Sequence, residues 1–212
     1  KLSRSRTTDE KMLSADGDQV FIVTSVNQDF SLKRLHRFIV LVREGGSVPI
    51  VVLSKVDLSK DHINLATQLK EKLKIDVLTT SSINNQGFDD LLQRMPEGST
   101  SIFVGSSGVG KSTLVNHLLK SNEQTTKDIR ADDDKGRHTT TARQLFFIPG
   151  HGMIIDTPGV REVQVFGSGE SLAKTFPSIE SLMEQCRFSN CQHETEPGCA
   201  VLGALESGEL DE

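Results

Sequence analysis

Near the middle of the chain runs the sequence Gly105-Ser106-Ser107-Gly108-Val109-Gly110-Lys111-Ser112, which fits the pattern G-x-x-x-x-G-K-[ST] in full. An apolar run at 101–104 precedes it and a helical pattern at 111–119 follows it, so we expect a buried strand before the loop and a helix after it. Glycines allow several backbone N–H groups to point at a phosphate, and the helix N-terminus adds its dipole. A glycine- and serine-rich turn without a ligand is the alternative, but both flanking elements favour nucleoside triphosphate binding.

The end of this loop carries the side chains with specific expected roles. Lys111 is expected to reach the β and γ phosphates, and the hydroxyl of Ser112 to bind Mg²⁺. Thr113, the next residue of the helix, is expected among the nucleotide contacts. Mg²⁺ is therefore an expected cofactor, bound together with the nucleotide.

The rest of the apolar pattern predicts an α/β fold. Short apolar runs predict strands at 20–23, 50–53 and 77–78, and a hairpin of 144–148 with 153–155. Apolar residues at helical spacing predict helices at 32–42, 63–73 and 88–92. Strands alternating with helices imply a mainly parallel sheet with helices on both faces. From about residue 177 onward the periodicity weakens, which predicts a small segment held by something other than an apolar core.

A candidate base-recognition motif, Ser54-Lys55-Val56-Asp57, follows the strand expected at 50–53. A carboxylate there can accept hydrogen bonds from the N1–H and N2–H₂ edge of guanine, a pattern that adenine does not offer, and the lysine stem can lie flat against the base. The motif resembles the N/T-K-x-D signature of GTPases, with Asp57 as a helix cap being the alternative. Because Ser54 is shorter than Asn or Thr, we expect fewer contacts to guanine and the phosphate loop, and weaker affinity without loss of specificity.

Three further motifs complete the set. Thr80-Ser81-Ser82 ends the next strand, where GTPases place a short loop beneath the guanine, so Ser81 and Ser82 are expected nucleotide contacts. Gly136-Arg137-His138-Thr139-Thr140-Thr141 resembles switch I, in which Thr140 would complete the Mg²⁺ shell. Asp156-Thr157-Pro158-Gly159 resembles the D-x-x-G of switch II, whose Asp156 and Gly159 would read Mg²⁺ and the γ-phosphate.

The order of these motifs predicts a circular permutation. Ordinary GTPases run from phosphate loop through switch I and switch II to the base signature, whereas here the base signature comes first. A permutation of this kind leaves the sheet and the site unchanged. The residue after D-x-x-G, where Ras-like enzymes have a water-orienting Gln, is Val160, so slow hydrolysis is expected. His138 is the best candidate to orient water, with a solvent-exposed loop histidine as an equal alternative.

All three cysteines lie in one short stretch, where Cys186, Cys191, His193 and Cys199 form the pattern C-x₄-C-x-H-x₅-C. Three thiolates and an imidazole are typical of a closed, structural, tetrahedral zinc site, so one zinc ion per chain is expected. Free thiols are the alternative, and a disulfide would leave one cysteine over.

Composition limits the remaining possibilities. The formal charge of −5 over 212 residues argues weakly against a generic nucleic-acid binder. No apolar run reaches the roughly 18 residues that span a bilayer, and no signal peptide is recognisable, so a cytoplasmic protein without membrane contact is expected. We expect residues 18–175 to form the permuted GTPase domain and residues 176–212 the zinc-binding segment, in a monomer.

These motifs together resemble the RsgA family, also called YjeQ, from about residue 4 to residue 205. The resemblance implies a circularly permuted GTPase that hydrolyses GTP to GDP and phosphate, stimulated by the 30S ribosomal subunit and contacting its rRNA during late maturation. Family members carry an N-terminal OB-fold and helices beyond the zinc site. Residues 1–17 are therefore expected to be a linker remnant, and residues 176–212 to be truncated. A non-hydrolysing, nucleotide-gated RNA-binding scaffold is the alternative function, and an ATPase or kinase is disfavoured by Asp57.

Overall fold

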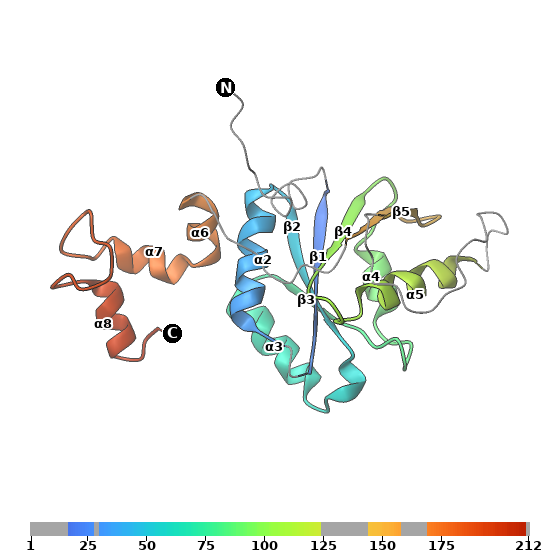
Figure 1. Cartoon of the computed structure of the whole chain (residues 1–212), viewed down its shortest axis with the longest axis horizontal. Helices are drawn as coiled ribbons and strands as arrows, with labels where there is room; N and C mark the ends of the chain where they lie inside the picture. Colours follow the sequence, from blue (N-terminus) through green and yellow to red (C-terminus); the bar gives the residue numbers. More distant parts are fainter. Residues whose placement is uncertain (1–16, 28–29, 124–143, 158–168, 211–212) are drawn as a thin grey trace, which may run out of the picture. The chain divides into compact units, whose positions relative to one another are not determined.

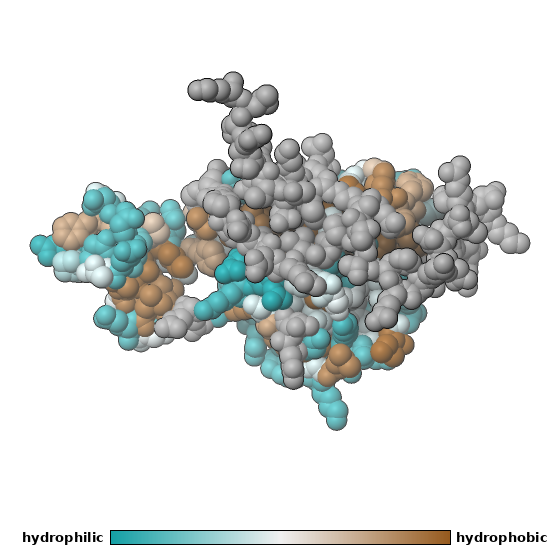
Figure 2. All heavy atoms as spheres, in the orientation of Figure 1, coloured by the Kyte–Doolittle hydropathy of each residue, from teal (hydrophilic) through white to brown (hydrophobic). Residues whose placement is uncertain are grey.

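The computed structural model describes residues 17–27, 30–123, 144–157 and 169–210. The chain divides into two compact units, Lys1–Phe166 and Gly167–Glu212. Within the described ranges, no helix is both long enough and apolar enough to cross a bilayer. On the face drawn in Figure 2, apolar residues of the described surface gather in separate small patches among hydrophilic ones.

The first unit is built on a six-stranded sheet with the strand order β3-β2-β1-β4-β6-β5 (Figure 1). The strands are β1 (Gln19–Ser25), β2 (Val48–Ser54), β3 (Asp76–Thr79), β4 (Thr100–Val104), β5 (Gln144–Phe147) and β6 (Met153–Asp156). All neighbouring pairs are parallel except β5 with β6, which forms the expected hairpin. The predicted mainly parallel sheet is therefore confirmed.

Helices cover both faces of this sheet, as the alternating pattern predicted. They are α2 (Leu32–Glu44), α3 (His62–Leu73), α4 (Phe88–Gln93) and α5 (Lys111–Glu123). Neighbouring side chains of a strand point to opposite faces. Accordingly Ile22 of β1 packs in the cluster that includes α2 and α3, whereas Phe21 packs in the cluster that includes α4 and α5. Both faces of the central strands are thus buried, which fixes the ends of those strands in place.

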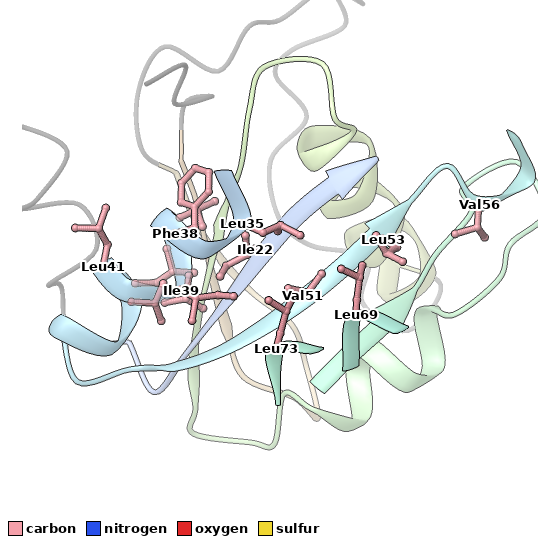
Figure 3. Packing of buried hydrophobic residues seen from close by; sticks show 14 residues of the cluster. Ile22, Leu35, Phe38, Ile39, Leu41, Val51, Leu53, Val56, Leu69 and Leu73 are labelled. Carbon is pink, nitrogen blue, oxygen red and sulfur yellow. The ribbon is translucent and has the colours of Figure 1, made fainter. Parts of the chain in front are cut away.

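Figure 3 shows the first of these clusters from close by. The buried side chains of the two helices lie against those of β1 and β2, and they include Leu35, Phe38, Ile39, Leu69 and Leu73. Local signals account for the bounds of α2: the Ser31 hydroxyl accepts a hydrogen bond from Arg34 N at 3.3 Å, and Gly46 adopts a φ of 79° just beyond the last turn. Gly45-Gly46 therefore ends this helix.

The second unit is organised differently. Its helices are short: α6 (Gly169–Thr175), α7 (Pro177–Met183) and α8 (Ala200–Glu206). Helix α7 buries no residue, and the buried apolar residues in the described part of this unit are Cys199, Val201 and Ala204. So small an apolar cluster is too little to hold a folded segment by itself.

Candidate functional site

The phosphate loop connects β4 to α5 and is packed against β1. Gly105 has a φ of 148°, and a Cβ atom at this position would lie 2.2 Å from the carbonyl oxygen of Val23. Only glycine fits so close to another backbone, which explains the first glycine of the pattern in physical terms. The loop therefore starts from a fixed position on the central strands of the sheet.

Lys111 is buried inside this loop, with 6% of its surface exposed. Its Nζ atom donates to the carbonyl oxygens of Gly105 at 2.8 Å and Ser106 at 2.9 Å. Burial lowers the pKa of Lys111, while the negative charge of Asp156 acts in the opposite direction. A cation held in this way, away from water, gains strongly from an incoming anion, because the attraction between two charges is stronger where water is excluded.

Switch II begins next to the phosphate loop. Asp156 ends β6 and lies opposite Phe103 of β4 in the parallel register. The hydroxyl of Thr157 donates to the carbonyl oxygen of Phe103 at 2.7 Å, and both Asp156 and Thr157 are buried. The acid of the D-x-x-G motif is therefore attached to the strand that leads into the phosphate loop.

The base signature lies against the phosphate loop, although the two are far apart in sequence. The Oγ atom of Ser54 lies 2.5 Å from the carbonyl oxygen of Val109 and 3.1 Å from that of Thr24, so its proton can be donated to either. Lys55, in the left-handed conformation with a φ of 57°, donates from Nζ to the carbonyl oxygen of Gly108 at 2.7 Å. The fold thus brings the base signature at 54–57 and the phosphate loop at 105–112 into one site. The short Ser54 side chain does reach the phosphate loop.

Asp57 is held by the loop that follows the next strand. The hydroxyl of Ser81, which is fully buried, donates to Oδ1 of Asp57 at 2.5 Å. The backbone supports this pairing, because Val56 N donates to the carbonyl oxygen of Thr80 at 3.2 Å. Asp57 lies in a short 3₁₀ helix, η1 (Val56–Leu58), which has no side-chain cap. Its hydrogen bond to Ser81 shows that the carboxylate is oriented by the loop that follows β3.

The other predicted residues of this site fall into two groups. Ser112 is half-buried and Thr113 exposed in the first turn of α5, and Ser82 is exposed beside Ser81. His138, Thr140 and Gly159 lie outside the described residues, as does Val160. The oxygen donors of Ser112 and Asp156 are the kind that Mg²⁺ prefers, so the described part of the site fits this ion.

One contact of the phosphate loop could not be predicted from the sequence. Arg34, in the first turn of α2, donates from Nη1 to the hydroxyl of Ser106 at 3.1 Å. The two residues also line a small pocket with Ser31 and Thr24. No local signal in the sequence indicates this contact, because it depends on how α2 packs beside β1.

In the second unit, the four predicted zinc ligands come together. The ligand atoms of Cys186, Cys191, His193 and Cys199 all lie within 4.8 Å of one another. The Sγ atoms of Cys186 and Cys199 are 3.9 Å apart, and Nδ1 of His193 lies 3.6 Å and 3.3 Å from them. A tetrahedral zinc ion with its usual bond lengths requires about 3.8 Å between sulfurs and about 3.5 Å between sulfur and nitrogen. The donor set therefore fits zinc, and none of the three cysteines forms a disulfide.

A carboxylate that the sequence did not single out organises this cluster. Glu196 accepts hydrogen bonds from the backbone N–H groups of Gln192 at 2.8 Å, Glu194 at 3.0 Å and Thr195 at 3.1 Å. Hydrogen bonds from the backbone, that of Gln192 first, lower the pKa of Glu196 to about 2. These N–H groups flank His193, which adopts the left-handed conformation with a φ of 61°. The sequence does offer one hint of this role, because Glu196 lies between His193 and Cys199.

A phosphate loop after the central strand, preceded in sequence by a base signature that contacts it, defines the class of circularly permuted GTPases. Two solved structures share the fold. YjeQ from Thermotoga maritima is 30% identical, with a TM-score of 0.66, and the match covers 93% of this chain and 67% of that one. YloQ, described as a circularly permuted GTPase, is 32% identical, with a TM-score of 0.63, over 92% and 63% of the two chains.

The sequence comparisons give the family. The RsgA GTPase family model matches residues 1–166. The small ribosomal subunit biogenesis GTPase RsgA 2 of Vibrio parahaemolyticus is 45% identical over 203 residues, which are 95% of this chain. The chain therefore belongs to the RsgA GTPase family, and the resemblance and the permuted fold expected from the motifs are confirmed. The chain spans 57% of the length of that relative.

Proposed function

We propose that this chain binds GTP and hydrolyses it to GDP and phosphate while acting on the small ribosomal subunit. The observation that carries the proposal is the contact of Ser54 and Lys55 with the carbonyl oxygens of Val109 and Gly108. It joins a guanine signature to a phosphate loop, which is what a guanine nucleotide requires of its site. The name of the Vibrio parahaemolyticus relative supports the ribosomal part of the proposal.

The nucleotide would be held by groups of two kinds. Backbone N–H groups of residues 105–112 and the N-terminus of α5 favour the phosphates. Lys111 would exchange the loop carbonyl oxygens for the β and γ phosphates, and the exchange is favourable because the phosphates carry full charge. Ser112 and Thr140 would hold Mg²⁺, which neutralises phosphate charge when bound. Asp156 and Gly159 would contact Mg²⁺ and the γ-phosphate.

Guanine would be read by Asp57. Ser81 fixes one carboxylate oxygen and so orients the group toward the donors of the base. Ser82, exposed in the same loop, would contact the base from its backbone. Adenine presents no such pair of donors, so discrimination follows from hydrogen bonds that one base makes and the other leaves unmade.

Hydrolysis by the isolated chain would be slow, because Val160 has no group to orient the attacking water. His138 would supply this function when switch I is fixed by the small subunit. His138→Ala should then lower turnover about 10²–10⁴-fold with GTP affinity nearly unchanged, the pattern of an interaction made mainly in the transition state.

The second unit would bind one zinc ion through Cys186, Cys191, His193 and Cys199. With all four positions filled by protein ligands, the ion would be structural and would supply rigidity, not chemistry. We place the protein in the cytoplasm as a monomer, in contact with the small subunit and its rRNA.

Single-turnover hydrolysis of GTP, measured with and without purified 30S subunits, tests the proposal. We expect slow turnover alone and a faster rate with 30S subunits but not with 50S subunits. ATP in place of GTP, and the Lys111→Ala variant, are the matched controls and should show no stimulated turnover. Equal rates with and without 30S subunits, or equal use of ATP, would contradict the proposal.

A further inference from the structure

The loop beneath the expected guanine position is closed on itself. Ser81 and Gln86 exchange backbone hydrogen bonds of 3.1 Å and 3.0 Å, which form an isolated antiparallel bridge. Gly87 follows with a φ of 79°, and a Cβ atom there would lie 1.8 Å from the carbonyl oxygen of Thr79. Residues 81–86 therefore form a short closed loop, attached to the sheet at one end.

The tip of this loop is attached to the phosphate-loop helix. Nε2 of His117, on α5, lies 2.5 Å from Oδ1 of Asn85. The same imidazole ring stacks on Phe88, the first residue of α4, with ring centroids 3.8 Å apart and an angle of 22° between the planes. With Oδ1 as the acceptor, Nε2 carries the proton. The side chain of His117 thus bridges α5, α4 and the loop.

His117 connects the two ends of the proposed nucleotide site. Helix α5 begins with Lys111, at the phosphate end of the site, and Ser81 holds Asp57 at the base end. Asn85 is exposed at the loop tip in the left-handed conformation, with a φ of 53°, so the contact with His117 is a fixed point for an otherwise solvated stretch. A loop that is fixed at the sheet and at its tip loses less conformational entropy when a guanine base binds to it.

We infer that His117 is a positioning residue for guanine, which holds the 81–86 loop against the phosphate-loop helix through Asn85. The inference rests on the proposed function, since it assigns a role in the recognition of the same nucleotide. His117 belongs to neither the phosphate loop nor the base signature. It acts on Ser81, and through Ser81 on the orientation of Asp57.

The test compares variants that separate the hydrogen bond from the stacking. His117→Phe keeps an aromatic ring on Phe88 and removes the bond, and Asn85→Ala removes the same bond from the other side. Asn85→Asp retains an acceptor and is the conservative rescue. Asn84→Ala, at the neighbouring exposed position, is the matched control. Dissociation constants for GDP, GTP and ADP are measured for the full chain by competition with a fluorescent guanine nucleotide.

We expect His117→Phe and Asn85→Ala each to weaken GDP binding about 3- to 10-fold, the range of one solvent-accessible hydrogen bond. ADP binding and the ratio of GDP to GTP affinity should stay unchanged, because the phosphate contacts are intact. Asn85→Asp and Asn84→Ala should bind GDP as the wild type does. GDP affinity within twofold of wild type in both loss variants, or equal weakening of GDP and ADP, would overturn the inference. Wild-type protein that binds ADP as tightly as GDP would overturn the proposed function itself, and this inference with it.

Discussion

Strands β2 and β4, which lead into the base signature and the phosphate loop, are buried on both faces, whereas the described stretch that carries the proposed zinc ligands has hardly any apolar core. In the first unit, Phe21, Ile22 and Phe103 are 0% exposed and lie on the central strands of the sheet. In the described part of the second unit, burial of apolar residues is confined to Cys199, Val201 and Ala204. We therefore expect the first site to depend on packing and the second on metal ligation, so that perturbing one leaves the other intact.

Removal of zinc should have the largest effect and should be confined to the second unit. Structural zinc contributes about 10–16 kcal/mol of apparent binding free energy in small zinc-finger peptides, far more than any single contact in the cluster. Chelation under reducing conditions should expose all three thiols and remove hydrogen-exchange protection from 186–199, with GDP affinity unchanged. Cys191→Ser should do the same, and Gln192→Ala, an exposed neighbour, should not. Loss of GDP binding upon chelation would show that the nucleotide site depends on the zinc-binding unit.

A cavity in the sheet should destabilise the first unit and leave the zinc content of the second unit unchanged. Phe103 is fully buried in β4 and stacks on Phe21 with ring centroids 4.9 Å apart. Phe103→Ala should reduce the free energy of unfolding of the first unit by about 3–5 kcal/mol, measured by urea denaturation. Phe147→Ala, at a side chain that is 57% exposed, should change it by less than about 0.5 kcal/mol. Zinc content should be normal in both variants, and a parallel loss of zinc from Phe103→Ala would show that the units are not independent.

Within the first unit, the packed sheet and the recognition of the base should also separate. Asp57→Asn replaces an acceptor of the guanine donors and should weaken GTP binding on the order of 10²-fold, with a shift of preference toward xanthosine triphosphate. The fold should be unaffected, since Asp57 is only half-buried and lies outside the strands. Asp61→Asn, an exposed carboxylate nearby, is the control. Unchanged GTP affinity in Asp57→Asn would mean that the hydrogen bond from Ser81 holds the carboxylate for a purely structural reason.

The architecture could be predicted from the sequence because it depends on periodicity. Apolar runs such as 50–53 and the helical spacing of 63–73 are local patterns, and the structure has β2 (Val48–Ser54) and α3 (His62–Leu73) at these places. The meeting of the base signature with the phosphate loop follows too, because parallel strands bring their carboxyl ends to the same edge of the sheet.

The contacts that could not be predicted depend on side chains that meet across the fold. The bond from Arg34 to Ser106 and that from His117 to Asn85 join residues on elements that the sequence does not relate. The expectation that Ser54 makes fewer contacts than Asn or Thr stays a prediction. Its distance of 2.5 Å to the carbonyl oxygen of Val109 depends on how closely two backbone segments approach, which side-chain length alone does not give. The role of Glu196 could not be predicted either, because it depends on a loop whose backbone N–H groups all point at its carboxylate.

The smallest expected effect concerns Glu196, and it tests whether ligation alone holds the second unit. Glu196→Gln removes the charge that accepts the N–H groups of Gln192, Glu194 and Thr195 around His193. Groups that orient metal ligands typically change metal affinity 10–100-fold, and an effect near about 10-fold is expected here because the carboxylate acts on the backbone and not on a ligand directly. Competition with a zinc chelator at pH 7 measures it, with Glu194→Gln as the control at an exposed neighbour.

The pH dependence of this effect follows from the direction of the pKa shift. The pKa of Glu196 falls from 4.5 to about 2 on folding, so the folded state favours the ionised carboxylate. Its contribution is fully present above about pH 4.5 and is lost as the pH falls toward about 2. The ratio of zinc affinities between wild type and Glu196→Gln should therefore be constant from about pH 7 to about pH 5, although both proteins bind zinc more weakly as their thiols protonate. A ratio that shrinks already between about pH 7 and pH 6 would mean that the effect titrates with a group other than Glu196, because even a carboxyl at its ordinary pKa of 4.5 is ionised in that range. A ratio of one at pH 7 would mean that the four ligands position the loop without it.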